Sequence, residues 1–304
     1  MYSFIVNPYS RSGRGMKIWN KIEPVLNERG VDYKVYFTKM PNHADKIVAK
    51  LSSAGDEHTF VILGGDGTLD EVLNGISDFE KVKIGYIPTG SSNDFARSLK
   101  LTTDPLKALD NILSATSTQS LDIGVLTYEN NTRNFMVSAG IGFDAAVCHQ
   151  AAKSKWKSLM NRIGLGKLTY VGIALSRILG STPSPMTLTL DDGKPRHFDR
   201  TYFIAFMNHK YEGGGFKFCP NAKYDDGLLD VIVAHNLSKL RILTILPQAF
   251  SGKHVGKTGI EIYTCKKASV NSTISLPVHT DGEPIYRGHN INTTLVKARI
   301  HLLV

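Results

Sequence analysis

A carboxylate set among glycines is the first group in this sequence that could do chemistry. It lies in Gly64-Gly65-Asp66-Gly67-Thr68, which follows the apolar run 60–63 and precedes an apolar helical pattern. Glycines after a strand let the backbone approach a phosphate, and the N-terminus of the next helix offers unpaired N–H groups. Because a carboxylate repels a phosphate, Asp66 predicts that Mg²⁺ or its water shell lies between them. A tight strand-to-helix turn, in which Asp66 and Thr68 cap the helix, would explain the same residues.

Two more loops of this type follow predicted strands. Residues 7–15 come after the first strand, and residues 88–95 lie between a strand and a helix; both loops are polar and contain glycine. The carboxyl ends of parallel strands share one edge of a sheet, so we expect the three loops to converge there. Turn chemistry accounts for each loop separately, but their joint placement favours a nucleotide pocket.

The elements that would carry these loops change character near residue 120. Before it, strand and helix patterns alternate, which is typical of a parallel sheet covered by helices on both faces. After it, short alternating strands are separated by Asp-Gly turn signals, and the tail 295–304 alternates as a half-buried strand. We therefore predict an α/β nucleotide-binding domain at 1–120 and a mostly antiparallel β-sandwich domain at 121–304, whose last strand could return to the first domain.

The positive charge of the chain is uneven. Of 304 residues, 36 are Lys or Arg and 27 are Asp or Glu, which gives a net charge of +9. Residues 145–190 contain no acidic residue but hold the cations Lys153, Lys155, Lys157, Arg162, Lys167 and Arg177. An apolar helical stripe runs among them, through Trp156, Leu159, Met160 and Ile163. This pattern predicts docking on an anionic membrane surface, although a core-packed helix with a solvated basic face would look the same.

Other features limit the class of protein. No apolar run approaches the roughly 20 residues of a membrane span, and the first residues lack the basic region of a signal peptide. The three cysteines are widely spaced and outside any C-x-x-C pattern, which favours a reducing cytosol. No helix-turn-helix, zinc-finger or RNP pattern accompanies the charge, so nucleic acid is not an expected partner. We expect a cytoplasmic protein, peripheral to the inner face of the membrane. Its oligomeric state is open, and a homodimer is one option.

Five motifs, in order along the chain, resemble one family. They are NPYSRSG, GGDGTLDEVLNG, PTGSSNDFAR, KYDDGLLD and TDGE, and together they span 7–283. The sequence resembles the diacylglycerol kinase catalytic family of bacterial soluble lipid kinases, which is related to sphingosine and ceramide kinases and more distantly to NAD kinases. The resemblance implies a two-domain fold with ATP between the domains. It also implies an ATP- and Mg²⁺-dependent kinase that acts on a lipid hydroxyl, first of all that of diacylglycerol, giving phosphatidic acid.

Two other functions stay open. An NAD kinase-like enzyme would share GGDGT and the two-domain plan, but Asn-Pro-x-Ser near the start and the late Asp-Gly-Glu favour a lipid kinase. A non-catalytic regulator that binds lipid or nucleotide would keep the fold while losing acidic residues. Those residues are all present: Asp66, Asp94, Asp281 and Glu283.

The resemblance assigns most of the loop residues to ATP. The implied contacts are Asn7, Pro8, Tyr9, Ser10, Arg11, Thr38, Gly65, Asp66, Gly67, Thr68, Leu69, Asp70, Glu71, Ser91 and Asp94. Within this set, Asp66 and Asp94 would anchor a network of Mg²⁺ and water. Arg11 replaces the usual glycine of the family, so it would add a cation beside the phosphates and remove backbone freedom. Asp70 replaces a usual Asn, and Ser91 replaces a usual Thr but keeps the hydroxyl.

The two late motifs would supply a base and a structural metal site. Transfer to a lipid hydroxyl needs a group that takes its proton; Asp281 or Glu283 fits, and we favour Glu283 slightly. Either carboxylate could instead bond backbone N–H groups within the turn. The resemblance implies a structural Mg²⁺ held by the Asp226 carboxylate and by the carbonyls of Lys223 and Leu228. A plain Asp-Gly hairpin turn is the alternative there.

Overall fold

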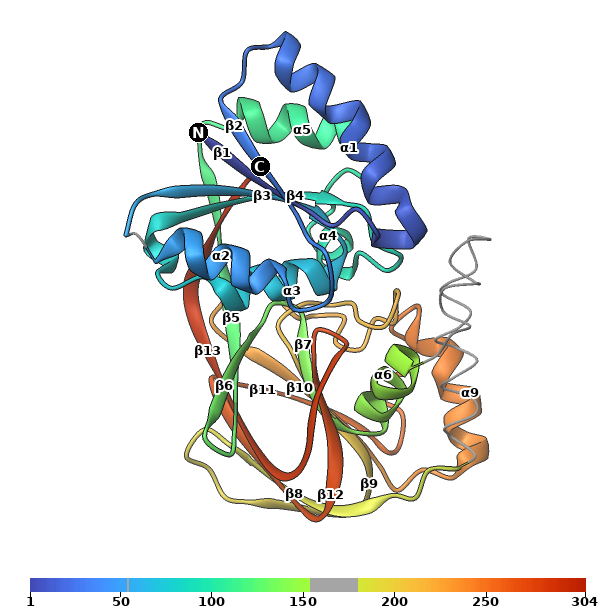
Figure 1. Ribbon diagram of the computed structural model, residues 1–304. Coiled ribbons are helices and arrows are strands. Elements are labelled where there is room, and N and C mark those ends of the chain that lie inside the picture. The colour runs from blue at the N-terminus through green and yellow to red at the C-terminus, as the bar shows by residue number, and fades with distance from the viewer. Residues whose placement is uncertain (54, 154–179) are drawn as a thin grey trace. The chain divides into compact units, whose positions relative to one another are not determined.

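The chain folds into two compact units. A computed structural model describes residues 1–53, 55–153 and 180–304, with the side chains of 151–153 outside the description. The N-terminal unit comprises Met1–Leu121 and Ala298–Val304, and the C-terminal unit comprises Asp122–Lys297 (Figure 1). The first unit is α/β with a parallel sheet and the second is mostly antiparallel β, which confirms the predicted fold class.

The N-terminal unit is built on a parallel sheet. Its strands are β1 (Tyr2–Val6), β2 (Tyr33–Phe37), β3 (His58–Gly64) and β4 (Val82–Pro88), in the order β2-β1-β3-β4. The end of β13 (Glu283–Leu303) adds a further parallel strand beside β4, where His301 pairs with Lys83. Strands β1 and β3 are buried over nearly their whole length, as expected for apolar runs in a sheet covered on both faces.

Helices cover both faces of this sheet (Figure 1). They are α1 (Ser10–Glu28), α2 (Ala44–Ser52), α3 (Asp66–Gly75), α4 (Asp94–Ser98) and α5 (Pro105–Ser114), with a 3₁₀ turn at Phe79–Lys81. Helices α1 and α5 share one face, where Trp19, Ile22 and Leu109 join a core cluster with side chains of β1 and β3. Helices α2 and α3 pack together on the other face. The loops after the strands are therefore left at one edge of the sheet.

The C-terminal unit is built from antiparallel strands. They are β5 (Thr118–Tyr128), which begins in the N-terminal unit, β6 (Asn131–Phe135), β7 (Ser138–Gly142), β8 (Ser184–Leu190), β9 (Arg196–Met207), β10 (Leu229–His235), β11 (Ile260–Cys265), β12 (Lys267–Thr280) and β13. The pairing order is β11-β10-β9-β7-β12-β13, and β8 pairs with both β9 and β12. Strands β7, β8, β9 and β12 thus form a closed circuit of pairing. Helices α6 (Phe143–Lys153) and α9 (Lys239–Ala249) complete the described part of this unit.

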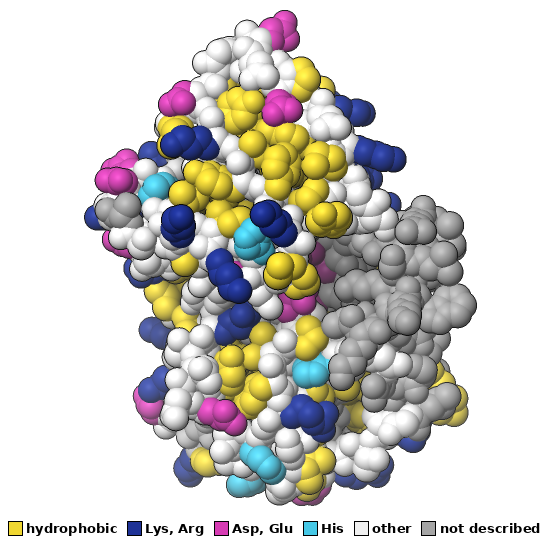
Figure 2. Space-filling view, viewed as in Figure 1, with side chains coloured by type: hydrophobic (Ala, Val, Ile, Leu, Met, Phe, Trp, Pro, Cys, Tyr) yellow, Lys and Arg dark blue, Asp and Glu magenta, His cyan; other side chains and the backbone are white. Residues whose placement is uncertain are grey.

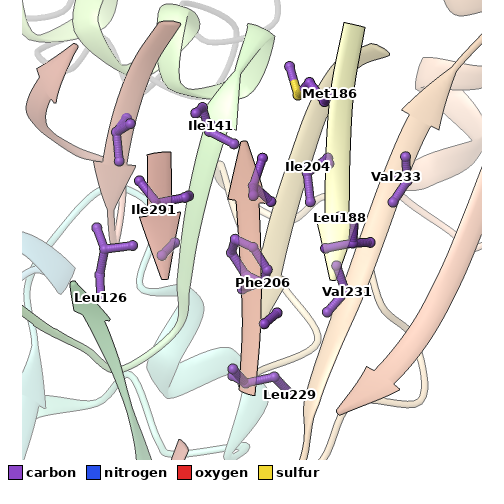
Figure 3. Close-up of a cluster of buried hydrophobic side chains, with 14 of the residues drawn as sticks. Leu126, Ile141, Met186, Leu188, Ile204, Phe206, Leu229, Val231, Val233 and Ile291 are labelled. Atoms are coloured by element: carbon purple, nitrogen blue, oxygen red, sulfur yellow. The ribbon is translucent and has the colours of Figure 1, made fainter. Parts of the chain in front are cut away.

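Side chains alternate across β9 and β10 between two apolar layers. Figure 3 shows Ile204 and Phe206 in the cluster between the strand layers. Phe203 and Ala205 point the other way, into a second cluster that includes Ile245 of α9. Because neighbouring residues of a strand face opposite sides, β9 is buried on both faces and helix α9 covers one of them.

The segment with the acid-free positive charge lies largely outside the described residues. Residues 154–179 and the side chains of 151–153 are not described, so the predicted apolar stripe and the cations around it fall there. In the part of the chain that is described, no helix is both long enough and apolar enough to span a membrane.

Candidate active site

Three loops leave the N-terminal sheet at the carboxyl ends of its strands. Backbone pairing continues one residue past the strands: the N–H of Asn7 donates to the carbonyl of Leu63 (2.9 Å), and the N–H of Thr89 donates to that of Gly64 (2.8 Å). Thr38, directly after β2, is buried at the same edge. The loops after β1, β3 and β4 therefore begin side by side.

The loops after β3 and β4 touch through their backbones. A Cβ atom on Gly90 would lie 2.6 Å from the Cα of Gly65, and a Cβ atom on Gly65 would lie 3.0 Å from the Cα of Gly90. A side chain at either position would push the two loops apart. Glycine at these positions is thus required by close packing of one loop on the other.

Side-chain hydrogen bonds tie the loop after β1 to the other two. The hydroxyl oxygens of Ser10 and Thr89 lie 2.6 Å apart. Nδ2 of Asn7 donates to Oγ1 of Thr68 (3.0 Å), while Oδ1 of Asn7 accepts the N–H of Tyr9 (3.1 Å). Asn7 therefore uses both ends of its amide to fix the shape of the site.

The start of α1 is held in a left-handed backbone conformation. The φ angles of Arg11, Ser12 and Gly13 are 43°, 57° and 91°. Residues other than glycine reach this region at a cost of about 1–2 kcal/mol each. Arg11 thus occupies a conformation that glycine would adopt freely, and such strain is often found where a ligand binds.

The Asp66 carboxylate reaches across to α4. Its oxygens accept the N–H groups of Asp94 (3.1 Å) and Phe95 (3.3 Å), and Asp94 is itself paired with Arg97. The N-cap of α3 is Gly65, which makes no side-chain capping bond. Asp66 therefore links two loops and does not cap the helix that follows it.

A buried tyrosine lies beside these two carboxylates. Tyr86 is 3% exposed, and within the described part of the chain its hydroxyl has no hydrogen-bond partner. Burial, followed by the charges of Asp66 and Asp94, raises the pKa of Tyr86 well above its usual value. The hydroxyl stays protonated and can donate to an oxygen placed among the three side chains. The water shell of a Mg²⁺ ion has such oxygens, so these residues fit the predicted ion.

The predicted ATP contacts differ in exposure. Those that keep exposed surface are Asn7, Tyr9, Arg11, Gly65, Asp66, Gly67, Glu71 and Ser91. The buried ones are Pro8, Ser10, Thr38, Thr68, Leu69, Asp70 and Asp94.

Some predicted contacts are engaged elsewhere in the unit. The Glu71 carboxylate accepts the N–H groups of residues 42–44 at the start of α2, over distances of 2.9 to 3.2 Å. Asp70 is fully buried in α3 and accepts a hydrogen bond from Asn74 (3.3 Å). Both carboxylates therefore bond other residues of the N-terminal unit.

In the C-terminal unit, Asp281 and Gly282 form the two-residue loop of a hairpin and lead into Glu283; residues Asp281–Glu283 are here called the acidic turn. Asp281 and Gly282 have φ angles of 49° and 80°, typical of a type I′ turn, and Thr280 pairs with Glu283. The Asp281 carboxylate accepts three N–H groups of residues 136–138 at 2.7, 2.7 and 2.9 Å. Burial raises the pKa of Asp281, and these three bonds oppose the rise. The half-buried Glu283 carboxylate has no hydrogen bond or ion pair with the described residues.

The turn at 223–228 gathers two carboxylates. The N–H of Gly227 donates to Oδ2 of Asp122 (2.7 Å), and the N–H of Leu228 donates to Oδ1 of Asp226 (3.0 Å). An all-oxygen set of carboxylates and carbonyls is what Mg²⁺ prefers. The predicted ligands Lys223, Asp226 and Leu228 fit this ion.

An apolar cavity lies in the C-terminal unit. It has a volume of about 100 Å³ and lies between α6, α9 and one face of β9 and β10. Its surface is almost wholly apolar, with side chains such as Phe203, Phe216 and Ile245. Asp144 and Glu212 stand at its margin. Such a cavity suits a hydrocarbon chain with one polar end.

Comparison with known proteins decides the family. Residues 1–126 match the diacylglycerol kinase catalytic domain, and residues 136–294 match the YegS C-terminal NAD kinase beta sandwich-like domain. The chain belongs to this two-domain lipid kinase family. The resemblance predicted from the motifs is therefore confirmed.

Relatives with this architecture span most of the chain. A putative lipid kinase, YtlR, from Bacillus subtilis is 27% identical and covers 92% of each chain. A diacylglycerol kinase from Mycobacterium tuberculosis is 29% identical over 92% of this chain and 87% of its own length. A probable YegS-like lipid kinase from Shewanella frigidimarina is 31% identical over 74% of this chain and 69% of its own length. The crystal structure of a putative diacylglycerol kinase from Bacillus anthracis superposes with a TM-score of 0.75 at 24% identity, covering 99% of this chain and 96% of that one, which shows the same fold.

Sequence reasoning missed Tyr86 in the N-terminal unit and four side chains in the C-terminal unit. Asp122 had a local signal, because a lone carboxylate between apolar residues of a strand needs a buried partner. Asp144, Glu212 and His279 had none, since they come from three distant parts of the chain and meet only in the folded unit.

Proposed function

We propose that this member of the lipid kinase family transfers the γ-phosphoryl group of ATP to the hydroxyl of diacylglycerol, giving phosphatidic acid, and that it requires Mg²⁺. The apolar cavity of the C-terminal unit supports a lipid acceptor, because a polar, soluble acceptor such as NAD would not need an almost wholly apolar site. Relatives named diacylglycerol kinase support the same acceptor.

The loops of the N-terminal unit would bind the nucleotide. The glycine backbone around Gly65 allows close approach to phosphate, and Arg11 adds positive charge beside it. Asp66 and Asp94 would hold Mg²⁺ through water, with the Tyr86 hydroxyl donating to that shell. The bound ion would supply neutralisation of the phosphate charge during transfer.

In the C-terminal unit, Glu283 would take the proton of the lipid hydroxyl. Asp281 already accepts three backbone N–H groups, and these bonds occupy the oxygens of its carboxylate and hold the turn in place. Glu283 has no such bonds in the described residues. We therefore assign proton removal to Glu283 and the anchoring of the turn to Asp281.

The direct test is incubation of the purified protein with radiolabelled ATP, Mg²⁺ and a panel of lipids in mixed micelles, with NAD as an alternative acceptor. We expect labelled phosphatidic acid. Labelled NADP would support the NAD kinase-like alternative, and no product with any acceptor would support the non-catalytic regulator.

We also propose that the protein works at the cytoplasmic face of an anionic membrane as a peripheral protein. Support comes from the sequence of residues 145–190, which carries six cations and no acid. On the face shown in Figure 2, the Lys and Arg side chains of the described residues are scattered and do not form one patch. Binding to anionic vesicles should fall steeply with salt, and reversing Lys153, Lys155 and Lys157 to Glu should weaken it.

Filling the cavity should discriminate between acceptors of different chain length. Ala249, on α9, lines the cavity and is 3% exposed. In Ala249→Phe, we expect the KM for long-chain diacylglycerol to rise about 10-fold, because each methylene kept out of the cavity loses about 0.8 kcal/mol. The KM for a short-chain acceptor should hardly change. Val255→Phe, at a position that is 41% exposed and does not line the cavity, is the control. Equal changes for both acceptors would show that the cavity does not hold the chains.

Binding of Mg²⁺ at the 223–228 turn should appear as a stability effect. Saturating Mg²⁺ should raise the Tm of the wild-type protein by about 2–5 °C over a sample with EDTA, and Asp226→Asn should lose this response. Asp225→Asn changes the neighbouring exposed carboxylate and should keep it. The same Mg²⁺ response in both variants would leave the plain hairpin turn as the better interpretation.

A further inference from the structure

His279 is the centre of a buried polar cluster behind the acidic turn. Its side chain is 0% exposed, and its Nε2 lies 3.1 Å from Oδ2 of Asp144 and 3.3 Å from Oε1 of Glu212. Its Nδ1 accepts the N–H of Gly282 at 3.2 Å. One ring thus contacts two carboxylates at the margin of the cavity and the backbone of the residue before Glu283.

These contacts define which ring nitrogen carries the proton. An N–H group that points at Nδ1 needs a lone pair there, so the neutral ring has its proton on Nε2, where Asp144 and Glu212 accept it. Ligand atoms of Cys148, Glu212 and His279 also lie within 4.8 Å of one another, as they would around a metal ion. A protonated Nε2 has no lone pair for a metal, so the cluster is a hydrogen-bond relay.

The backbone around the cluster is shaped to hold the Asp144–His279 pair. A Cβ atom on Gly140 would lie 2.0 Å from Oδ2 of Asp144 and 2.6 Å from Nε2 of His279. The second oxygen of Asp144 accepts the N–H of Ala145 at 2.7 Å, which fixes the carboxylate at the start of α6. The ring therefore meets a carboxylate whose own position is set by the backbone.

We propose that His279 is a positioning residue for the acidic turn. Asp144 and Glu212 accept its Nε2–H and so fix the tautomer in which Nδ1 is unprotonated. This Nδ1 accepts the N–H of Gly282 and thereby positions the next residue, Glu283, which carries the base. The inference rests on the proposed role of Glu283. The Asp281 carboxylate anchors one side of the turn, and His279 anchors the peptide that leads into Glu283. A displacement of about 1 Å at a reacting group can lower a rate about 10²-fold, so this second anchor matters for catalysis.

Protonation of His279 removes the hydrogen bond between its Nδ1 and the N–H of Gly282, which anchors the turn. The ionisable groups that face the ring are Asp144, Cys148, Glu212 and Asp281. Burial lowers the pKa of His279, but Glu212 and Asp144 outweigh burial and raise it to about 9. The bond from Gly282 opposes that rise, because it forms only with an unprotonated Nδ1. The fraction of molecules in which Gly282 is hydrogen-bonded to His279 should therefore rise as the pH increases through the pKa of His279.

The test is His279→Gln, because glutamine can still donate to the two carboxylates but has no acceptor in the position of Nδ1. We expect kcat to fall about 10- to 100-fold, with less than about a 2-fold change in the KM for lipid. The amide of Gly282 should exchange faster with D₂O, measured by NMR. His235→Gln is the matched control, since Nε2 of His235 also lies against a carboxylate of this unit, Glu261, at 2.7 Å. It should leave kcat unchanged.

Asparagine at the same position should restore the hydrogen bond from the N–H of Gly282. The Oδ1 of the side chain in His279→Asn lies close to where Nδ1 was, so it can accept the Gly282 N–H and should restore amide protection and part of kcat. If this variant does not fold, the glutamine variant and its pH profile decide alone. The wild-type kcat should rise through the pKa of His279, and His279→Gln should lack that limb.

Three results would overturn the proposal: wild-type kcat in His279→Gln, unchanged exchange of the Gly282 amide in that variant, or the same pH limb in both proteins. Failure of the proposed function has a different signature. In that case the wild-type protein would phosphorylate no lipid, while the Gly282 amide would still lose protection in His279→Gln, which supports the hold itself.

Discussion

Asp66→Asn is expected to lower kcat for phosphoryl transfer about 10³-fold and to lower the free energy of unfolding by only about 1–2 kcal/mol. The amide keeps one oxygen that can accept the N–H of Asp94 or Phe95, so the link between the two loops survives in part. The substitution removes the negative charge that would hold the water shell of Mg²⁺, and a metal at the transferring phosphoryl group is worth several kcal/mol. The measurement is the rate of labelled phosphatidic acid formation, with thermal unfolding of the same samples.

Asp104→Asn is the matched control for this experiment. The Asp104 carboxylate accepts the N–H groups of Leu106 (3.0 Å) and Lys107 (3.2 Å) at the start of α5, as Asp66 does at the start of α4. We assign no catalytic role to it, so its kcat should match the wild type. If Asp66→Asn also kept wild-type kcat, Asp66 would be only a structural link between loops, and the metal assignment would be wrong.

Local sequence signals were sufficient to predict the arrangement of the N-terminal unit. Alternating strand and helix patterns imply a parallel sheet, and a parallel sheet puts the loops at 7–15, 64–68 and 88–95 on one edge. The partner of Asp66 was not predictable in this way. Its carboxylate bonds the start of a helix 28 residues further along, and neither the predicted role in holding Mg²⁺ nor the alternative, a cap on the next helix, indicated this partner.

In the C-terminal unit, local sequence signals predicted the fold class but not the cavity or the His279 cluster. Alternating short strands indicated its antiparallel fold class, because the period of two is visible in the sequence. The cavity was not visible, since apolar residues that line a cavity have the same types and spacing as residues of a filled core. The His279 cluster could not be predicted for another reason. Its members come from α6, from β12 and from the segment between β9 and β10, and no spacing along the chain indicates contacts between segments so far apart.

The two carboxylates of the acidic turn should fail in different ways when they are changed. Glu283→Gln should lower kcat about 10²- to 10⁴-fold, the usual loss for a general base, and leave the Tm unchanged because the side chain makes no bond with the described residues. Asp281→Asn should lower the free energy of unfolding by about 2–3 kcal/mol, because a charged acceptor of three N–H groups is replaced by an amide whose NH₂ group faces donors. Both variants are measured by lipid phosphorylation and by denaturant unfolding.

A third variant is the control for this comparison of Asp281 and Glu283. Glu129→Gln changes an exposed glutamate in another hairpin turn of the same unit, between β5 and β6, and should alter neither kcat nor stability. If Asp281→Asn lost as much kcat as Glu283→Gln at unchanged stability, Asp281 would be the base. The three backbone bonds argue against that outcome. Taking a proton would weaken the acceptor that fixes the turn, so a base at Asp281 would loosen its own support each time it acted, whereas Glu283 can be protonated without breaking a bond that holds the acidic turn in place.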